Sequence, residues 1–354
     1  MIDPLLASKK TQKPRMDISK KKPFFPVSDL LNNYLIDIGR VKKLPISYMD
    51  LLRYTDGFPL MDKHGKNTLW ESVIYGGDTI REFNEGLTFI YSLLKTDGDM
   101  SFMQHLYVDR IDYCHFGNSK PFRIRIVNKF NDNYDYFYVK KTDASRVYGL
   151  ELEYILSPNR INFFVDGDTL IEEHIPGIPG DKFMDSYTET PSFNKVRIAK
   201  EFVKFNERCF VRLLGDMRSY NYVVDITPDF EDEQYRVRAI DFDQQCYEGR
   251  KNMYLPQFYK ENRMVVDFCA EVMTPETVEQ YRQEERVLIR RRYETAQHRF
   301  QKLVHCLCND KLSTKVKTES LRKELERYHK KSFTQCKNMG QILDYHLKLI
   351  LCIS

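Results

Sequence analysis

Two carboxylates and one amide stand at a spacing that suits the chemistry of phosphoryl transfer. Asn221 follows Asp216 by five residues, and Asp241 comes twenty residues after Asn221, at the end of an apolar run. Phosphoryl transfer requires a carboxylate that orients, or takes the proton of, the attacking hydroxyl. It also requires oxygen ligands for the magnesium that bridges the nucleotide phosphates. Asp216 suits the first task, and Asn221 with Asp241 suits the second.

The composition is that of a folded chain with room for two lobes. Of the 354 residues, 42% are apolar and 13% are aromatic, which is enough for a hydrophobic core. The net charge of +4 is concentrated in residues 1–22, where seven Lys or Arg stand against two Asp. We expect this basic tail to be solvated, and we do not expect nucleic acid as a partner.

Membrane and metal-hydrolase classes find no support in the sequence. No apolar run approaches the roughly 18–20 residues that span a bilayer, and the first residues lack the apolar segment of a secretory signal. The eight cysteines include no Cys-x-x-Cys pair, so we expect reduced thiols and a cytoplasmic location. The motifs Gly-x-x-x-x-Gly-Lys-Ser/Thr, Gly-x-Ser-x-Gly and His-Glu-x-x-His are all absent.

The spacing of apolar residues changes near residue 105, from a helical pattern before it to β-rich runs after it. Helical spacing predicts an N-terminal extension of helices over 28–38, capped by Ser28, and over much of 46–98. Turn residues then separate β-rich runs. They predict strands over 106–115, 121–129 and 134–141, a helix over 144–156, and strands over 161–165 and 169–175.

The second half is predicted to be mainly helical. A hairpin is expected over 222–226 and 234–240, and Thr274 with Pro275 is expected to start a long helix that reaches about Cys306. The other predictions are a helix over 193–208, a strand over 210–214, and helices over 318–330 and 339–351. The resulting division is a basic tail (1–27), a helical extension (28–104), an N-lobe (105–176) and a C-lobe with a helical tail (177–354).

This order of elements and polar residues resembles the protein-kinase-like superfamily. It is most similar to the aminoglycoside and choline phosphotransferase branch, and more distantly to toxin-type serine/threonine kinases, over roughly residues 105–305. The resemblance implies an α+β, bilobal kinase-like fold with a small antiparallel β-rich N-lobe and a mainly helical C-lobe. It also implies ATP and Mg²⁺ as cofactors, with Asp216 as the catalytic aspartate and Asn221 and Asp241 as magnesium ligands.

Two further residues gain roles from the resemblance. Arg218 stands where relatives carry Lys or His, and a cation there would neutralise charge on the transferring group. Asp243 replaces the glycine of the Asp-Phe-Gly motif, and it would either contact a second metal ion or stabilise the turn.

The N-lobe of such proteins holds the nucleotide with a strand lysine that pairs with a helix glutamate. Lys140 and Lys141 end the third predicted strand. Val139 would suit a wall that faces the adenine, and alternation puts Lys141 on the same face as Val139, which favours Lys141. The glutamate would be Glu153 or Glu151. The stretch 170–177, which includes Glu173, resembles the hinge. Its backbone groups would pair with the adenine edge and Ile175 would pack on the base, with surface charges on an edge strand as the alternative for Glu172 and Glu173.

Two departures weaken the case for a conventional protein kinase. The first hairpin, 115–119, has no Gly-x-Gly-x-x-Gly, and no Ala-Pro-Glu follows Asp243. We therefore expect ATP- and magnesium-dependent transfer of the γ-phosphate to a hydroxyl of a small molecule. An atypical protein Ser/Thr kinase, AMP transfer to protein, and a pseudokinase without turnover are the alternatives. The resemblance places the acceptor pocket in residues 181–210 and 247–354, where the sequence contains no diagnostic motif.

Overall fold

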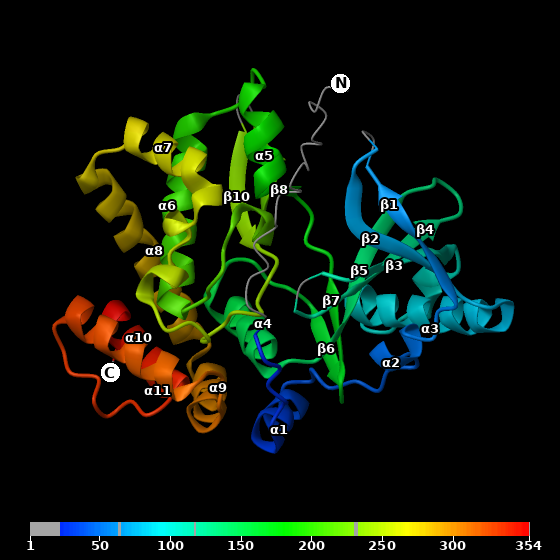
Figure 1. Ribbon diagram of the computed structural model, residues 1–354, viewed down its shortest axis with the longest axis horizontal. Coiled ribbons are helices and arrows are strands. Elements are labelled where there is room, and N and C mark those ends of the chain that lie inside the picture. The colour runs from blue at the N-terminus through cyan, green and yellow to red at the C-terminus, as the bar shows by residue number, and fades with distance from the viewer. Residues whose placement is uncertain (1–21, 63–64, 117, 230–232, 354) are drawn as a thin grey trace, which may run out of the picture.

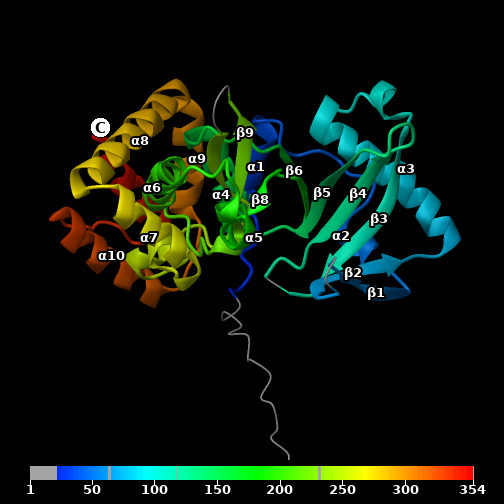
Figure 2. The same ribbon diagram turned by 90° about the horizontal axis from the view of Figure 1, so that it is seen from above.

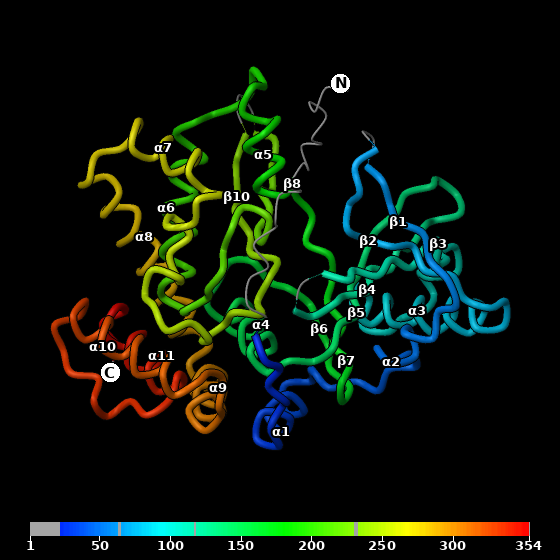
Figure 3. The backbone as a smooth tube through the Cα atoms, viewed as in Figure 1, coloured from blue at the N-terminus to red at the C-terminus, as the bar shows by residue number. Residues whose placement is uncertain are grey.

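A computed structural model describes residues 22–62, 65–116, 118–229 and 233–353, which form two lobes (Figure 1). An antiparallel sheet with helix α3 (Gly77–Thr96) makes the first lobe, and helices make most of the second. The view from above separates the two along the long axis (Figure 2), and the backbone tube shows the chain passing between them at helix α4, Ala144–Leu156 (Figure 3). The predicted α+β architecture, with a small antiparallel β-rich lobe and a mainly helical lobe, is confirmed. Most of the predicted basic tail, residues 1–21, lies outside the described residues.

Seven antiparallel strands form the sheet of the first lobe, in the order β1-β2-β3-β4-β5-β7-β6. Side chains of a strand alternate between its two faces. In β5, Phe137 and Val139 are fully buried in the core that includes α3, and Lys140 faces the other way. The strands are β1 Asp56–Met61, β2 Asn67–Ile74, β3 Leu106–Cys114, β4 Phe122–Asn128, β5 Tyr134–Lys141, β6 Phe163–Asp166 and β7 Thr169–Glu173.

The N-terminal extension is only partly helical, so the prediction of helix over much of 46–98 is wrong in part. Between α2 and α3, strands β1 and β2 form a hairpin that extends the sheet beyond β3. Branched and aromatic residues such as Thr68, Trp70 and Val73 favour this strand. The helices are α1 Asp29–Asp37, whose cap Ser28 accepts from the Leu31 N–H as predicted, α2 Tyr48–Leu51 and α3 Gly77–Thr96.

Helix α4 (Ala144–Leu156) joins β5 to β6 and lies between the two lobes (Figure 1). Asp143 caps it by accepting a hydrogen bond from the Ser145 N–H at 3.0 Å, and it also binds Nζ of Lys22 at 2.9 Å. A Cβ on Gly149 would come within 2.9 Å of the Cβ of Phe242. Helix α4 therefore packs directly against the segment that contains the predicted metal ligand Asp241.

The central helix of the second lobe is α6 (Lys195–Arg212), which contacts α7, α8 and α11. The predicted strand over 210–214 is wrong. Helix α6 continues to Arg212 and ends at Leu213, which has a φ of 52° and donates its N–H to the carbonyl of Cys209. Leu214 forms only an isolated bridge with Gln245. The run is apolar, and periodicity alone does not distinguish a short buried strand from a helix end.

Helices cover most of the remaining chain. The long helix predicted from Thr274 is two helices, α8 and α9, which Ala296 separates. None of the described helices has the length and apolar character to cross a membrane. The remaining elements are β8 Ile178–Pro179, α5 Gly180–Ser186, β9 Tyr222–Pro228, β10 Glu233–Ala239, α7 Arg263–Val272, α8 Pro275–Thr295, α9 Gln297–Asn309, α10 Lys315–His329 and α11 Met339–Leu351, with short 3₁₀ turns between them.

Two histidines, the half-buried His329 of α10 and the fully buried His346 of α11, lie against each other. Nε2 of His329 lies 2.9 Å from Nδ1 of His346, and Nε2 of His346 lies 3.0 Å from the carbonyl oxygen of Phe210. The carbonyl can only accept, so Nε2 of His346 carries its proton and Nδ1 accepts from His329. Burial lowers the pKa of His329 to about 4 and that of His346 to about 3. Both rings are therefore neutral in the folded protein at neutral pH.

This pair is expected to make the protein less stable in mild acid. A histidine whose pKa is lowered by folding stabilises the protein fully above its unfolded pKa of about 6.5, and that stability is lost as the pH falls toward the folded value. The melting temperature should therefore fall between pH 6.5 and pH 4, and the free energy of unfolding should fall by up to about 3 kcal/mol for each histidine. In His346→Gln, whose amide can still donate to Phe210, this part of the pH dependence should shrink. An unchanged pH dependence in that variant would contradict the assignment.

Candidate active site

A cavity of about 580 Å³ lies between the two lobes and contains most of the predicted site residues. Strands β2, β3, β4, β5 and β7 supply one side, and residues 174–179, 219–223 and 240–243 supply the other. Six of the predicted residues line it: Lys140, Glu173, Ile175, Asn221, Asp241 and Asp243. Asp216 and Arg218 lie beside it, whereas Lys141 and Glu153 do not belong to its lining.

Lys140 is the lysine that reaches the cavity. Its ammonium lies 2.8 Å from Oε2 of Glu172, a buried residue of β7. The two residues are neighbours across β5 and β7, because Lys140 pairs with Leu170 and Tyr138 pairs with Glu172 in the ladder. Burial and the nearby Arg146 guanidinium lower the pKa of Lys140.

The inference that Lys141 faces the cavity is wrong. Lys141 is exposed on the opposite face of β5, and its ammonium lies 5.3 Å from the centre of the Phe24 ring. The inference took Val139 as part of the cavity wall. Val139 instead packs into the core beneath the sheet, so strand alternation places Lys140 in the cavity.

Arg146, in the first turn of α4, is the centre of the charged network in this cavity. Its side chain is fully buried and pairs with Glu172, to which Nη2 donates at 2.8 Å. Its Nη1 donates to Oδ1 of Asp241 at 3.0 Å and to Oδ1 of Asp243 at 2.8 Å. Although burial alone would raise it, Arg146 and Lys140 hold the pKa of Glu172 down to about 2. One guanidinium therefore joins three carboxylates from β7 and from the end of β10.

The helix glutamates predicted to pair with the lysine lie elsewhere. Glu153 forms a buried ion pair with Arg212 of α6. Glu151 accepts from Nε of Arg299 at 2.6 Å and from the hydroxyl of Tyr34 at 2.8 Å. The prediction of a lysine–glutamate pair with Glu153 or Glu151 is therefore wrong. Helix α4 presents an arginine to the cavity, and the glutamate comes from β7.

Asp241 and Asp243 are both close to Arg146 but differ in exposure. Oδ1 of Asp241 also accepts from the N–H of Asp243 at 3.0 Å, and its side chain is about one-third exposed, whereas Asp243 is buried. Burial, followed by the neighbouring carboxylate of Asp243, raises the pKa of Asp241 to about 6. Within the described chain, no hydrogen bond engages Oδ2 of Asp241. That oxygen is available to a ligand in the cavity.

The Asp216 loop is held by backbone contacts and by Arg218. Asp216 has a φ of 59°, and its N–H donates to the Tyr259 hydroxyl at 2.9 Å. Its Oδ1 accepts from Nε of Arg218 at 2.8 Å, and Arg218 also binds Glu261 at 2.9 Å. Asn221, which lines the cavity, donates through Nδ2 to the Asp216 carbonyl at 2.7 Å, and within the described chain no hydrogen bond engages its Oδ1. Burial raises the pKa of Asp216.

Residues of the stretch that resembles a hinge, among them Glu173 and Ile175, line the cavity. Ile175 is buried in its wall, next to His174. The carboxylate of Glu173 accepts from the N–H of Asn162 at 3.0 Å, so that side chain is already engaged. Of the two predicted hinge residues, Ile175 offers the apolar surface.

The oxygen atoms at one end of the cavity fit a magnesium ion that is shared with phosphates. Magnesium is usually held by one or two protein oxygens together with substrate phosphates rather than by a full protein cage. Asp241 and Asn221 supply such a pair on the cavity wall. The described residues contain no group of three or more His, Cys, Asp or Glu that could hold a metal ion.

Several residues of the cavity escaped the sequence analysis. Arg146 and Glu172 are charged residues within a predicted helix and a predicted strand, but the sequence does not show that they pair, because their contact depends on the fold. Trp70 and Arg123 come from β2 and β4 and join the cavity only through the sheet.

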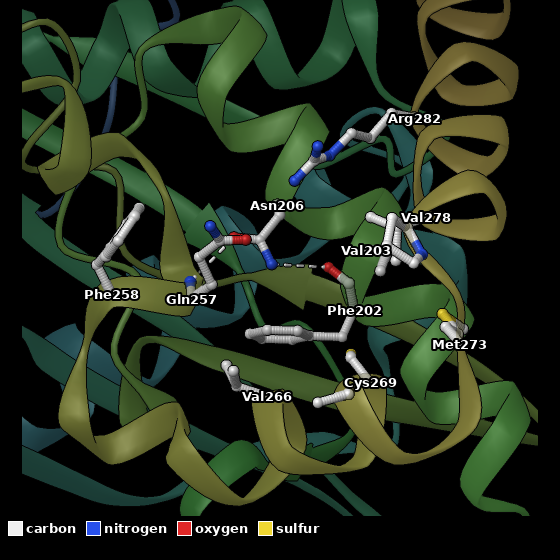
Figure 4. A pocket seen from close by; sticks show the side chains of 12 residues that line it. Phe202, Val203, Asn206, Gln257, Phe258, Val266, Cys269, Met273, Val278 and Arg282 are labelled. Carbon is white, nitrogen blue, oxygen red and sulfur yellow. Dashed lines mark hydrogen bonds between the residues drawn. The ribbon is translucent and has the colours of Figure 1, made fainter.

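A second cavity of about 620 Å³ lies inside the helical lobe among α6, α7 and α8 (Figure 4). Its lining is mainly apolar, with Phe202 and Val266 on its floor, and Asn206 donates to the Phe202 carbonyl at 3.2 Å. None of the predicted site residues lines it. Its lining does come from the segments 181–210 and 247–354 that the sequence analysis associates with the acceptor.

Comparisons with known proteins give little beyond this geometry. No family model matches the sequence, and no curated protein matches it. A solved structure of the autoinhibited serine kinase domain of titin is 14% identical, with a TM-score of 0.27, over 70% of this chain and 94% of that chain. A structure of titin kinase with its flanking domains is also 14% identical, with a TM-score of 0.26, over 68% of this chain and 54% of that one. Likeness at this level is too weak to indicate a shared activity or ligand.

Proposed function

We propose that this chain is a phosphotransferase that uses ATP and Mg²⁺ and moves the γ-phosphate to a hydroxyl of a small molecule. One observation carries the proposal. Lys140, Glu172, Arg146 and Asp241 form a continuous series of charged contacts along the cavity wall, and Asn221 lies beside its end. The cations Lys140 and Arg146 suit the phosphate groups of a nucleotide. The side-chain oxygens of Asp241 and Asn221 suit the metal ion that such phosphates carry.

Each residue would perform a distinct task. The Lys140 ammonium would donate to phosphate oxygens, and Glu172 and Arg146 keep it in place. Oxygens of Asp241 and Asn221 would bind the magnesium, which when bound neutralises phosphate charge. The carboxylate of Asp216 would orient the acceptor hydroxyl and take its proton, while Arg218 would stabilise negative charge on the transferred group.

A second candidate is a nucleotide-binding module without turnover. The observation that favours it is the contact between Nη1 of Arg146 and Oδ1 of Asp241. The Arg146 guanidinium already neutralises part of the negative charge of Asp241, which a magnesium ion would otherwise neutralise. The two candidates differ in turnover but share the nucleotide site.

Exchanging each of the adjacent lysines tests the assignment of Lys140. Lys140→Met should lower ATP affinity about 10- to 100-fold, because it removes a charge-assisted hydrogen bond to phosphate while Arg146 still satisfies Glu172. Lys141→Met is the matched control and should leave affinity within about twofold, because Lys141 lies on the other face of β5. Calorimetric titration measures both. Equal losses in the two variants would refute the assignment.

The proposal is tested by transfer of label from γ-labelled ATP. The purified chain with Mg²⁺ should label at least one member of a panel of small hydroxyl compounds, and chelation of the metal should stop the labelling. Labelling confined to proteins of an extract would replace the small-molecule acceptor with a protein one. ATP binding without transfer to any acceptor or to water would favour the module without turnover.

A further inference from the structure

The hairpin of β1 and β2 brings an aromatic residue into the wall of the candidate active site. Strand β2 pairs with the edge of β3, with Trp70 opposite Cys114 and Ser72 opposite Asp112. This pairing places Thr68, Leu69 and Trp70 in the lining of the cavity. The N-terminal extension is therefore part of the site.

Trp70 is held in place by a stacked arginine. The guanidinium of Arg123 lies 4.5 Å from the centre of the Trp70 ring and 5.0 Å from that of Tyr136. Asp112, which is fully buried, accepts from Nη2 of Arg123 at 2.7 Å and from its Nε at 3.0 Å. The Arg123 guanidinium is fixed by Asp112 and lies near the rings of Trp70 and Tyr136. This cation–π contact restricts the movement of the Trp70 indole.

The aromatic wall continues from Trp70 to the hinge. The Trp70 and Tyr138 rings are 6.4 Å apart, and the Tyr138 and His174 rings are 5.9 Å apart. The Tyr138 hydroxyl also lies 3.3 Å from Nδ1 of His174. The ammonium of Lys140 lies 5.2 Å from the centre of the Tyr138 ring. The aromatic wall and the charged network therefore meet at Tyr138.

We propose that Trp70, held by Arg123, forms the base-binding wall of this site and that a nucleobase stacks along the row Trp70–Tyr138–His174. The inference rests on the proposed function, because it assigns the base end of the same nucleotide. A planar base stacks favourably on aromatic side chains, and a polyphosphate group would then extend past Tyr138 toward Lys140. The β1–β2 hairpin thus contributes directly to ligand binding.

Intrinsic fluorescence tests the inference, because Trp70 is the only tryptophan of the chain. Titration of the full chain with ATP should change the tryptophan emission saturably, with the same dissociation constant that calorimetry gives. Inorganic tripolyphosphate, which has no base, should compete with ATP but leave the emission nearly unchanged.

Affinity measurements on two variants complete the test. Trp70→Ala should weaken ATP binding about 10-fold or more, as expected for a lost stacking contact, and should leave tripolyphosphate binding unchanged. Phe58→Ala is the matched control, because Phe58 is an exposed residue of the same hairpin outside the cavity lining. It should bind ATP as the wild type does.

The outcomes separate the inference from the proposed function. If the wild type binds ATP by calorimetry but its emission does not change, or if Trp70→Ala binds ATP normally, the base-binding role of Trp70 is overturned and the proposed function stands. If the wild type binds no nucleotide, both are overturned. The fluorescence of the wild type decides the inference even if Trp70→Ala does not fold.

Discussion

Asp216→Asn is expected to lower turnover about 10²- to 10⁴-fold, the range for loss of a general base. The amide keeps the size of the side chain but accepts a proton far more weakly than a carboxylate does. ATP affinity should stay near that of the wild type, because Asp216 lies beside the nucleotide cavity and not in its lining. Labelled-phosphate transfer and calorimetric titration of ATP measure the two effects.

The control for this variant is Asp267→Asn, which changes an exposed residue of α7 that pairs with Arg263. It should leave both turnover and ATP affinity unchanged. If Asp216→Asn turns over at the wild-type rate, Asp216 is not the base. If Asp216→Asn also loses ATP binding, Asp216 contributes to nucleotide binding, contrary to the prediction that it acts only on the acceptor hydroxyl.

Arg146→Met is expected to have the largest effect on stability of any single change in the cavity. Glu172 and Asp243 are buried, and removing the shared guanidinium leaves their charges poorly compensated. Loss of one partner from a buried ionic network typically costs about 3–5 kcal/mol. Urea unfolding should show a lower midpoint than the wild type with a similar dependence on denaturant concentration.

Two further variants make this prediction specific. Arg146→Lys keeps the charge but cannot contact three carboxylates at once, so its loss of stability should be intermediate. Arg290→Met removes an arginine that pairs with Glu294 on the surface of α8, and it should cost less than about 1 kcal/mol. A midpoint for Arg146→Met equal to that of Arg290→Met would contradict the role of Arg146 as the centre of the network.

The sequence predicted the segments in which local pattern and tertiary environment agree. Strand β5 and helices α4 and α11 have the predicted bounds, because apolar period, turn residues and caps all favour the same elements. The same holds for the spacing of Asn221 and Asp241, both of which line the cavity.

The errors arose where residues distant in the sequence determine the structure. Strand β2 depends on the edge of β3, and Trp70 enters the cavity only through that pairing. The lysine was assigned to the wrong face because Val139 packs on the α3 side of the sheet, which alternation alone does not reveal. The pairing of Lys140 with Glu172 similarly depends on the register of β5 and β7.

In the proposed function, Asp241 holds a magnesium ion that is shared with the nucleotide phosphates. Calorimetric titration of ATP with and without Mg²⁺, on the wild type and on Asp241→Asn, tests it most directly. The wild type should bind ATP at least about tenfold more tightly with Mg²⁺, whereas Asp241→Asn should bind with an affinity that Mg²⁺ does not change. Wild-type binding that is indifferent to Mg²⁺, or an Asp241→Asn variant with the full magnesium effect, would contradict the claim.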